Sequence, residues 1–331
     1  MKNSGFGTTE TLITSHLEPL NNDGATSNTY KVCINGIWYF QKRPKTEYTD
    51  HPHYVAAFEK EFSIGSNLDH PNIVKYLKKE TDDTGIYLLT EYVDGWNLKE
   101  FVEKNPYYFN YKAHRKKFVE QLLSALEYLH NHKILHLDLK PENIMISYVG
   151  LDVKLIDLGF AYSSGHLYQS IGKTNIYAAP EQLITNSTSI NQCADIYGFG
   201  MILLYIFAQS ANKNLIYKIP QPYKDCTEKC LQQHPVHRFQ QINEVKSFIK
   251  RKLIERKVLK IFWIVFALFF VVIIAIVIFE LTDRQIPIEE ASRSKFYPFA
   301  LIRNGVVIFV VGITVNYFTK KHLKRKNTIN R

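Results

Sequence analysis

The sequence of 331 residues predicts an α+β protein with a small strand-rich lobe, a larger helical lobe and then a transmembrane helical hairpin. Three observations carry this prediction. Runs of aromatic and β-branched residues lie in the first third of the chain, leucines at helical spacing follow them, and long uncharged apolar runs end the chain. With 46% hydrophobic residues the chain can build a core, which excludes disorder as its main state.

The positive charge is concentrated where the apolar runs are. The net charge is +10, yet residues 1–249 carry 25 Lys/Arg and 26 Asp/Glu, whereas residues 250–331 carry 16 and five. Basic residues beside apolar runs are typical of membrane proteins. We therefore expect contact with a lipid bilayer through residues 261–318, and no nucleic-acid partner.

In chain order, residues 1–14 are expected to form an extension, and the first lobe follows. Residues 30–34 and 37–41 predict two strands, because they flank the dipeptide Asn-Gly, the strongest short signal of a hairpin. Residues 86–93 (IYLLTEYV) predict another strand. Residues 111–130 place leucines and aromatic residues at helical spacing, so the second lobe begins with a helix.

Short polar motifs follow in a fixed order in the second lobe. Residues 136–143 read HLDLKPEN, residues 157–159 read DLG, residues 179–181 read APE and residues 195–200 read DIYGFG. In this order and spacing they resemble the eukaryotic-type serine/threonine protein kinase family, over about residues 15–250. The resemblance implies the bilobal protein-kinase fold, phosphoryl transfer to protein hydroxyls, and ATP and Mg²⁺ as cofactors.

The resemblance also implies the roles of four polar residues. Asp138 matches the catalytic aspartate that orients the acceptor hydroxyl and takes its proton, and Lys140 matches the lysine that neutralises the γ-phosphate. Asn143 and Asp157 match the two positions that hold magnesium. Such residue types suit phosphoryl transfer, which needs alignment and charge neutralisation more than covalent help.

On the nucleotide side, Lys42 matches the lysine of the third strand, and Glu61 on a helix predicted at 54–67 is its expected ion-pair partner. Phe40 stands two residues before Lys42, where the family usually has a small residue above the adenine. Either the adenine pocket is reshaped or the register of the strand differs, and in the second case Lys45 takes the place of Lys42.

Two further segments are expected to bind ATP. Residues 22–27 (NDGATS) stand where the family has a loop with three glycines, and Gly24 is their only glycine. Residues 90–93 (TEYV) resemble the hinge that binds adenine through backbone groups. Glu91 and Val93 are therefore expected to contact ATP, with Thr90 as the small residue that guards the deeper pocket.

Substrate class and regulation follow from single positions. The KPEN string and Thr174 in the activation segment resemble serine/threonine kinases, with a small-molecule acceptor as an alternative. Leu137 replaces the arginine that usually pairs with a phosphorylated activation-loop residue, so activity is expected not to depend on loop phosphorylation. Phe40 and the poor glycine loop keep a second hypothesis open, a membrane-tethered pseudokinase that acts as a scaffold.

Three residues are expected to support the second lobe without touching substrate. Asp195 is expected to hydrogen-bond the backbone of the catalytic loop. Glu181 is expected to form an ion pair with Arg238. The resemblance implies scaffold roles for all three.

Residues 261–279 contain 19 residues without a charge, which as a helix extend about 28 Å and match the hydrocarbon layer of a bilayer. Residues 296–318 predict a weaker second span, because Arg303 and Asn304 interrupt them; a re-entrant or interfacial segment is the alternative. Residues 280–295 form the short loop between the two spans.

The flanking charges predict the topology. Residues 250–260 and 320–331 carry six Lys/Arg each, whereas residues 280–298 carry three. The positive-inside rule therefore places both flanks in the cytosol, that is, the juxtamembrane segment 251–260 and the tail 319–331. We expect an integral membrane protein whose kinase domain acts on protein substrates at a cytosolic membrane surface, in an oligomeric state that the sequence leaves open.

Overall fold

The structure is a computed structural model that describes residues 14–20, 26–49, 51–163, 176–183 and 190–283. Gly24, Thr174 and the predicted second span at 296–318 lie outside the described residues. The chain divides into two compact units, Met1–Arg256 and Lys257–Arg331.

The first lobe is a five-stranded antiparallel sheet in the order β1-β2-β3-β5-β4. Its strands are β1 (Thr14–Pro19), β2 (Ser27–Ile34), β3 (Ile37–Pro44), β4 (Tyr76–Asp82) and β5 (Gly85–Glu91). Asn35 and Gly36 join β2 to β3 with φ of 51° and 80°, the left-handed conformation that a two-residue hairpin turn requires. The predicted hairpin is confirmed. β5 ends at Glu91, so the predicted strand at 86–93 is two residues too long and Val93 lies in the following connection.

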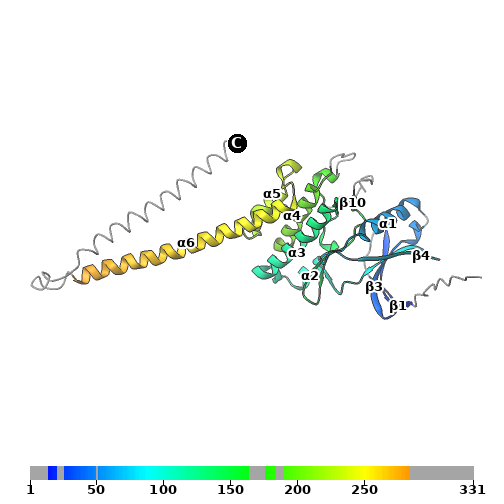
Figure 1. Ribbon diagram of the computed structural model, residues 1–331, viewed down its shortest axis with the longest axis horizontal. Helices are drawn as coiled ribbons and strands as arrows, with labels where there is room; N and C mark the ends of the chain where they lie inside the picture. The colour runs from blue at the N-terminus through cyan, green and yellow to red at the C-terminus, as the bar shows by residue number, and fades with distance from the viewer. Residues whose placement is uncertain (1–13, 21–25, 50, 164–175, 184–189, 284–331) are drawn as a thin grey trace, which may run out of the picture. The chain divides into compact units, whose positions relative to one another are not determined.

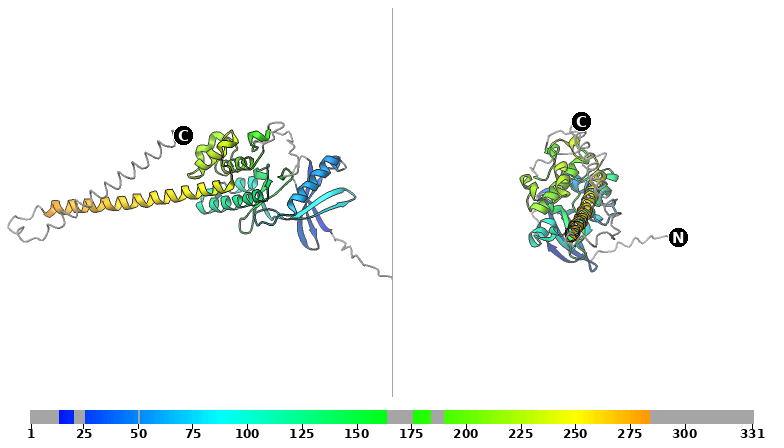
Figure 2. Two further views of the ribbon diagram at one scale, coloured as in Figure 1. Left: turned by 45° about the horizontal axis from the view of Figure 1, so that its top comes forward. Right: turned by 90° about the vertical axis from the view of Figure 1, so that its left-hand side faces the viewer.

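Helix α1 (Pro52–Gly65) lies beside this sheet and contacts β4 and β5 (Figure 2). A short 3₁₀ helix, η1 (Thr46–Tyr48), precedes it, and Pro52 occupies the first turn, where a missing N–H costs nothing. Phe58 and Ile64 are buried, and so is Glu61. The predicted helix at 54–67 is thus confirmed, beginning and ending two residues earlier.

The second lobe is mainly helical, and Figure 1 shows α2 to α5 at the opposite end of this unit from the strands β1 to β4. Its helices are α2 (Leu98–Lys104), α3 (Lys112–Asn131), α4 (Cys193–Ala208), α5 (Tyr223–Cys230) and the start of α6 (Ile242–Asp283). The 3₁₀ helices are η2 (Tyr108–Asn110), η3 (Pro141–Asn143), η4 (Pro180–Leu183), η5 (Lys213–Lys218) and η6 (Pro235–His237). The predicted helix at 111–130 corresponds to α3, whose leucines are fully buried at positions such as Leu122, Leu126 and Leu129.

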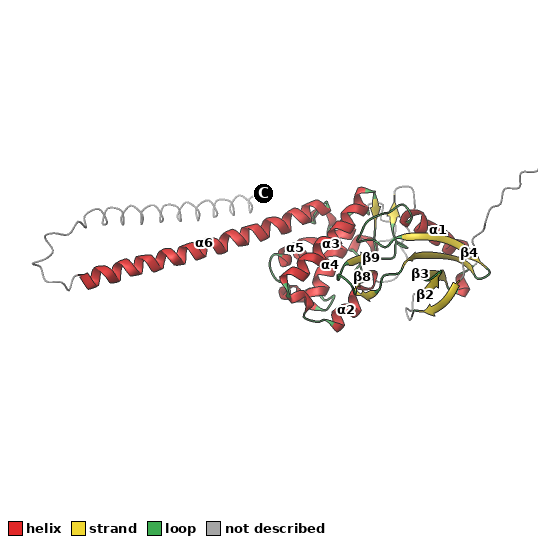
Figure 3. Ribbon diagram, turned by 60° about the horizontal axis from the view of Figure 1, so that its bottom comes forward, coloured by secondary structure: helices red, strands yellow, loops and turns green. Residues whose placement is uncertain are grey.

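Two small sheets lie next to two of the polar motifs of this lobe. Their strands are β6 (Gly95–Asn97), β8 (Ile144–Ser147) and β9 (Val153–Leu155) in one sheet, and β7 (Ile134–Leu135) and β10 (Tyr162–Ser163) in the other. Figure 3 labels β8 and β9 of the larger sheet. Ile144 pairs with Leu155, so residues 143 and 156 lie side by side at the edge of the β8–β9 ladder. The segments after β7 and β9 therefore emerge close together, and these segments hold the motifs HLDLKPEN and DLG.

Two apolar helices in the chain have opposite environments. Nearly all of α4 is buried in the second lobe, including Ile196, Phe199 and Leu203. The apolar part of α6 buries none of its residues within the structure. Among the described residues, α6 is the one helix long and apolar enough to cross a membrane, by length and composition only.

Candidate active site

Three charged side chains from distant parts of the chain meet at the junction of the two lobes. The Lys42 Nζ on β3 donates hydrogen bonds to Glu61 Oε2 on α1 at 2.9 Å and to Asp157 Oδ1 after β9 at 2.8 Å. The predicted Lys42–Glu61 ion pair is present. This ion pair favours Lys42 over the alternative Lys45 as the lysine of the third strand.

Tyr76 on β4 completes this cluster, although no sequence motif pointed to it. Its hydroxyl donates to Glu61 Oε1 at 2.8 Å and accepts a hydrogen bond from the Leu158 backbone N–H at 3.1 Å. The Tyr76 ring packs against Gly65, where an added Cβ would lie 2.3 Å from a ring carbon. Tyr76 thus links α1 to the DLG segment, a contact whose only sequence signal is the glycine at the end of α1.

The electrostatics of the cluster keep Lys42 and Asp157 charged. Burial alone would lower the pKa of Lys42, but the carboxylates of Asp157 and Glu61 outweigh burial and raise it above its ordinary value. Burial alone would likewise raise the pKa of Asp157, yet Lys42 lowers it from 3.8 to about 2. Asp157 is therefore ionised at neutral pH. A third of its side chain is exposed, whereas Glu61 is buried.

In the predicted catalytic loop, the side chains of Lys140 and Asn143 both form hydrogen bonds to Asp138. The Lys140 Nζ donates to Asp138 Oδ2 at 2.6 Å, and the Asn143 Nδ2 donates to the same oxygen at 2.8 Å and to the Asp138 backbone carbonyl at 2.9 Å. Asp138 and Asn143 are buried. The structure therefore brings together Asp138, Lys140 and Asn143, as the sequence predicted.

Asn143 and Asp157 lie at neighbouring places at the end of the β8–β9 ladder. The Ile156 backbone N–H donates to the Asn143 carbonyl at 3.0 Å, and Asp157 is the next residue. The Asp157 Oδ1 accepts hydrogen bonds from the Lys42 Nζ at 2.8 Å and from the Gly159 backbone N–H at 3.0 Å. An ionised carboxylate and an amide oxygen are ligands that Mg²⁺ prefers. These two residues thus have the chemistry to hold a divalent cation.

Asp195, in the first turn of α4, supports the catalytic loop. Its carboxylate accepts hydrogen bonds from the backbone N–H groups of His136 and Leu137 at 2.9 and 2.8 Å and makes a 2.8 Å contact with the His130 Nε2. Burial alone would raise its pKa, but the hydrogen bond from His130 outweighs this and holds the pKa below its ordinary value. The predicted bond between Asp195 and the loop backbone is confirmed. Leu137 itself is buried.

The predicted Glu181–Arg238 ion pair is also present. The guanidinium donates to both carboxylate oxygens, at 2.6 and 2.8 Å, and the Arg238 side chain is fully buried. Such bidentate geometry fixes both side chains in one arrangement. The pair therefore anchors η4, which contains the last two residues of the motif APE.

The residues predicted to contact adenine, Glu91 and Val93, lie at the end of β5 and in the connection that follows it. Phe40 pairs with Thr90 across β3 and β5, and it lies on the same face of β3 as Lys42 two residues later. The Thr90 hydroxyl donates to the Glu91 carbonyl at 3.2 Å, and Val93 is half-buried just beyond. A half-buried aromatic ring therefore stands where a small residue was expected above the base.

Comparisons with known proteins agree with this geometry. Residues 23–257 match the family described as protein kinase domain. The serine/threonine-protein kinase PrkC of Bacillus subtilis is 27% identical over 233 residues, 62% of this chain and 35% of the relative. Calcium-dependent protein kinase 5 of Plasmodium falciparum is 35% identical over 155 residues (46% and 26%), and mitogen-activated protein kinase kinase kinase 2 of Arabidopsis thaliana is 30% identical over 207 residues (55% and 31%). The chain spans 35% or less of the length of these relatives.

Proposed function

This chain belongs to the protein kinase family, and on that premise we propose that it is a membrane-anchored serine/threonine protein kinase, which transfers the γ-phosphate of ATP to hydroxyl groups of proteins. The observation that carries the proposal is the set of ion pairs around the motifs HLDLKPEN and DLG. Lys42 contacts Glu61 and Asp157, and Asp138 contacts Lys140.

The catalytic loop supplies the groups for the acceptor. Asp138 orients the hydroxyl of the substrate and takes its proton as the oxygen forms a bond to the γ-phosphorus, while the bond to the oxygen bridging to ADP breaks. Lys140 lies next to Asp138, at 2.6 Å, and neutralises charge on the transferred group. Protein substrates are supported by the serine/threonine pattern of the KPEN string and Thr174.

The nucleotide is held from the other side of the site. Lys42, held by Glu61, positions the phosphates of ATP, while Glu91 and Val93 offer backbone groups to the adenine. Asn143 and Asp157 have the oxygen ligands for Mg²⁺, which when bound neutralises the charge of the phosphates. Gly24 is assigned to ATP binding from the sequence alone, because it stands in the segment that matches the glycine loop of the family.

Incorporation of labelled phosphate from Mg-ATP tests the proposal directly. We expect the full chain in detergent to phosphorylate itself or a generic protein substrate on serine or threonine, and Asp138→Ala to lower the rate at least about 100-fold. Phosphoamino-acid analysis identifies the acceptor. Equal incorporation by the wild type and by Asp138→Ala would show that the phosphate comes from a contaminating enzyme and would refute the assignment.

Activity in this proposal does not require phosphorylation of the activation loop. Leu137 is buried and offers no cation to a loop phosphate, unlike the arginine usual at its position. We expect phosphatase-treated protein to keep its initial rate. A lag that disappears as the protein phosphorylates itself would contradict this part.

A second candidate function, a membrane-tethered scaffold without phosphoryl transfer, is favoured by one observation. Phe40, which pairs with Thr90 across β3 and β5, is bulkier than the small residue that the family usually has at this position. Calorimetric titration with Mg-ATP separates the two candidates. A wild type that binds no ATP and incorporates no phosphate would favour the scaffold, whereas binding with turnover excludes it.

The membrane anchor rests on α6. We propose that residues 261–279 cross the bilayer and that residues 296–318 return to the cytosol, because basic residues flank both ends of this region and its apolar side chains on α6 are exposed. A glycosylation acceptor placed within 280–298, and another after Arg331, report topology in microsomes. Modification of the loop alone is expected. Modification after Arg331 would contradict the second span.

A further inference from the structure

The peptide unit just before Asp138 is held at both ends by side chains. Its carbonyl, that of Leu137, accepts a hydrogen bond from the Gln182 Nε2 at 2.8 Å, and its N–H, that of Asp138, donates to the His136 Nδ1 at 3.3 Å. All four residues are buried. The orientation of this peptide plane therefore sets the direction in which the Asp138 side chain leaves the backbone.

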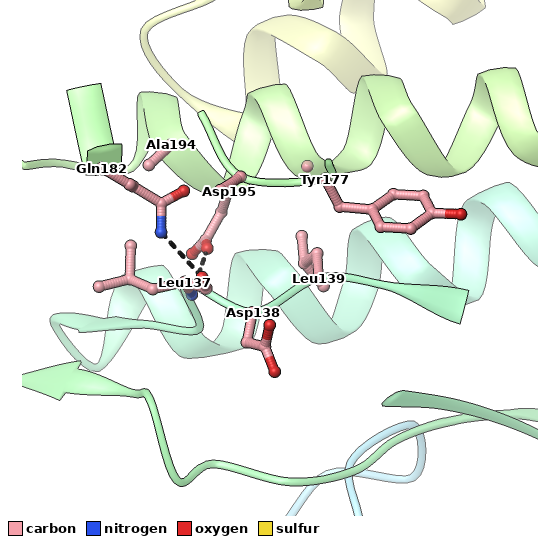
Figure 4. A pocket seen from close by; sticks show the side chains of 9 residues that line it. Leu137, Asp138, Leu139, Tyr177, Gln182, Ala194 and Asp195 are labelled. Atoms are coloured by element: carbon pink, nitrogen blue, oxygen red, sulfur yellow. Dashed lines mark hydrogen bonds between the residues drawn. The ribbon is translucent and has the colours of Figure 1, made fainter. Parts of the chain in front are cut away.

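The backbone at Leu137 needs this support. Leu137 has φ of 62°, in the left-handed region that residues with a Cβ rarely adopt. A conformation of this kind persists only where the surroundings hold it. Asp195 holds the N–H of Leu137 at 2.8 Å, and Gln182 holds its carbonyl. Figure 4 shows both side chains reaching Leu137 from one side of the loop, while the Asp138 carboxylate points to the other.

The other end of the Gln182 amide is bonded to the segment that follows the activation loop. Its Oε1 accepts a hydrogen bond from the Ala179 backbone N–H at 2.9 Å, and Ala179 is fully buried. The preceding residue, Glu181, is fixed by its ion pair with Arg238. One amide group thus joins the catalytic loop to a segment 45 positions later, and that segment is itself anchored in the core.

We propose that Gln182 is a positioning residue for phosphoryl transfer, which clamps the peptide unit before Asp138 and couples it to the segment around Ala179. The inference rests on the proposed function. Position 137 has leucine and no arginine, so it cannot form an ion pair with a phosphate on the activation loop. In this proposal the uncharged amide of Gln182 fixes the catalytic loop instead. The bridge is permanent, because neither of its hydrogen bonds depends on phosphorylation.

Gln182→Met tests the clamp, because methionine has a similar length and cannot make either hydrogen bond. Gln121 offers a matched control: its Oε1 accepts from the Val153 backbone N–H at 2.9 Å and its Nε2 donates to Asp152 at 2.7 Å, away from the catalytic loop. In the full chain we expect Gln182→Met to lower kcat about 10- to 100-fold with an unchanged KM for ATP. Gln121→Met should lower the melting temperature while leaving kcat unchanged.

Amide hydrogen exchange provides a readout that does not depend on activity. Exchange at the amides of Ala179 and Asp138 should become at least about 10-fold faster in Gln182→Met and stay unchanged in Gln121→Met. Gln182→Glu serves if the methionine variant does not fold, because it keeps the acceptor for Ala179 but loses the donor to Leu137. In Gln182→Glu we expect kcat to fall and amide exchange to become faster at Asp138 but not at Ala179.

The outcomes separate the clamp from the proposed function. A wild type without kinase activity would refute the proposed function, while faster exchange at Asp138 in the variants would still support the clamp. Unchanged exchange at Asp138, or a kcat that Gln182→Met leaves intact, would overturn it. So would equal losses of kcat in Gln182→Met and Gln121→Met, because the loss would then follow stability rather than position.

Discussion

Two groups of buried ion pairs lie in this domain, and they differ in their exposure to solvent. In the first, Lys42 contacts Glu61 and Asp157 at the junction of the lobes. In the second, Arg238 contacts Glu181 deep in the helical lobe. A third of the Asp157 side chain is exposed, whereas the Arg238 side chain has no exposed surface.

The two groups also differ in the hydrogen bonds that their cations make outside the ion pairs. Beyond Glu181, Arg238 donates to three backbone carbonyls, those of Gln232 at 2.8 Å and of Cys193 and Gln233 at 3.0 Å. A buried charge that is fully bonded within the protein serves the fold. A charge whose partner is partly exposed can exchange that partner for a ligand. The comparison teaches that the first group is built to bind and the second to support.

The largest effect is expected from a substitution in the first group. Asp157→Ala should lower the rate of phosphoryl transfer about 100- to 1,000-fold, because the phosphates lose the carboxylate assigned to their metal ion. The melting temperature should fall by only a few degrees, since Lys42 keeps Glu61 as its partner. Turnover above a tenth of the wild-type value would show that the assignment is wrong.

The second group should respond in the opposite way. Arg238→Met leaves Glu181 buried without its partner, so we expect the free energy of unfolding to fall by about 3–5 kcal/mol in urea titrations. The double variant Arg238→Met/Glu181→Leu removes both charges and should recover part of the loss. If the single variant were as stable as the wild type, the pair would not support the fold.

A smaller effect is expected from the variants that test the assignment of Lys42 on β3. Lys42→Ala should lower the rate about 10- to 100-fold, because the lysine that bridges Glu61 and Asp157 is lost. Lys45→Ala is the matched control, a lysine three residues away that follows the strand, and its initial rate should equal that of the wild type. The reverse ranking would contradict the assignment of Lys42.

The smallest expected effect concerns pH. Burial favours the protonated form of Asp157, but Lys42 lowers its pKa to about 2 in the folded protein, below the ordinary 3.8. Because the folded pKa is the lower one, the carboxylate stabilises the fold above about pH 4 and loses this contribution as the pH falls towards 2. The difference in free energy of unfolding between the wild type and Asp157→Asn should therefore be constant near neutral pH and shrink below about pH 4. A difference that widened there would contradict the sign.

Much of the site could be predicted because its residues are close to one another in short motifs. Asp138, Lys140 and Asn143 lie within one short segment, residues 138–143, so they are already close in the sequence, and hydrogen bonds join them. The Asn-Gly hairpin likewise sets the register of β2 and β3, and alternation along β3 then places Phe40 and Lys42 on one face. In these cases local geometry leaves few alternatives.

Contacts between distant segments were predicted only where a resemblance supplied the pair. The ion pairs of Lys42 with Glu61 and of Glu181 with Arg238 belong to this group. Tyr76 and Gln182 were missed, because tyrosine in a strand and glutamine after a motif are ordinary choices for many environments. Their roles depend on partners up to 82 positions away in the sequence.

The sequence by itself predicted the β2–β3 hairpin, β5 and the helix α3 from turn chemistry and periodicity, and the order of its motifs identified the charged residues through a resemblance. Only the tertiary structure decided that Leu137 adopts a left-handed backbone and that Gln182 and Asp195 hold it there. The physical reason is that a strained dihedral angle is set by packing and hydrogen bonds across the fold, and no local preference of leucine encodes it.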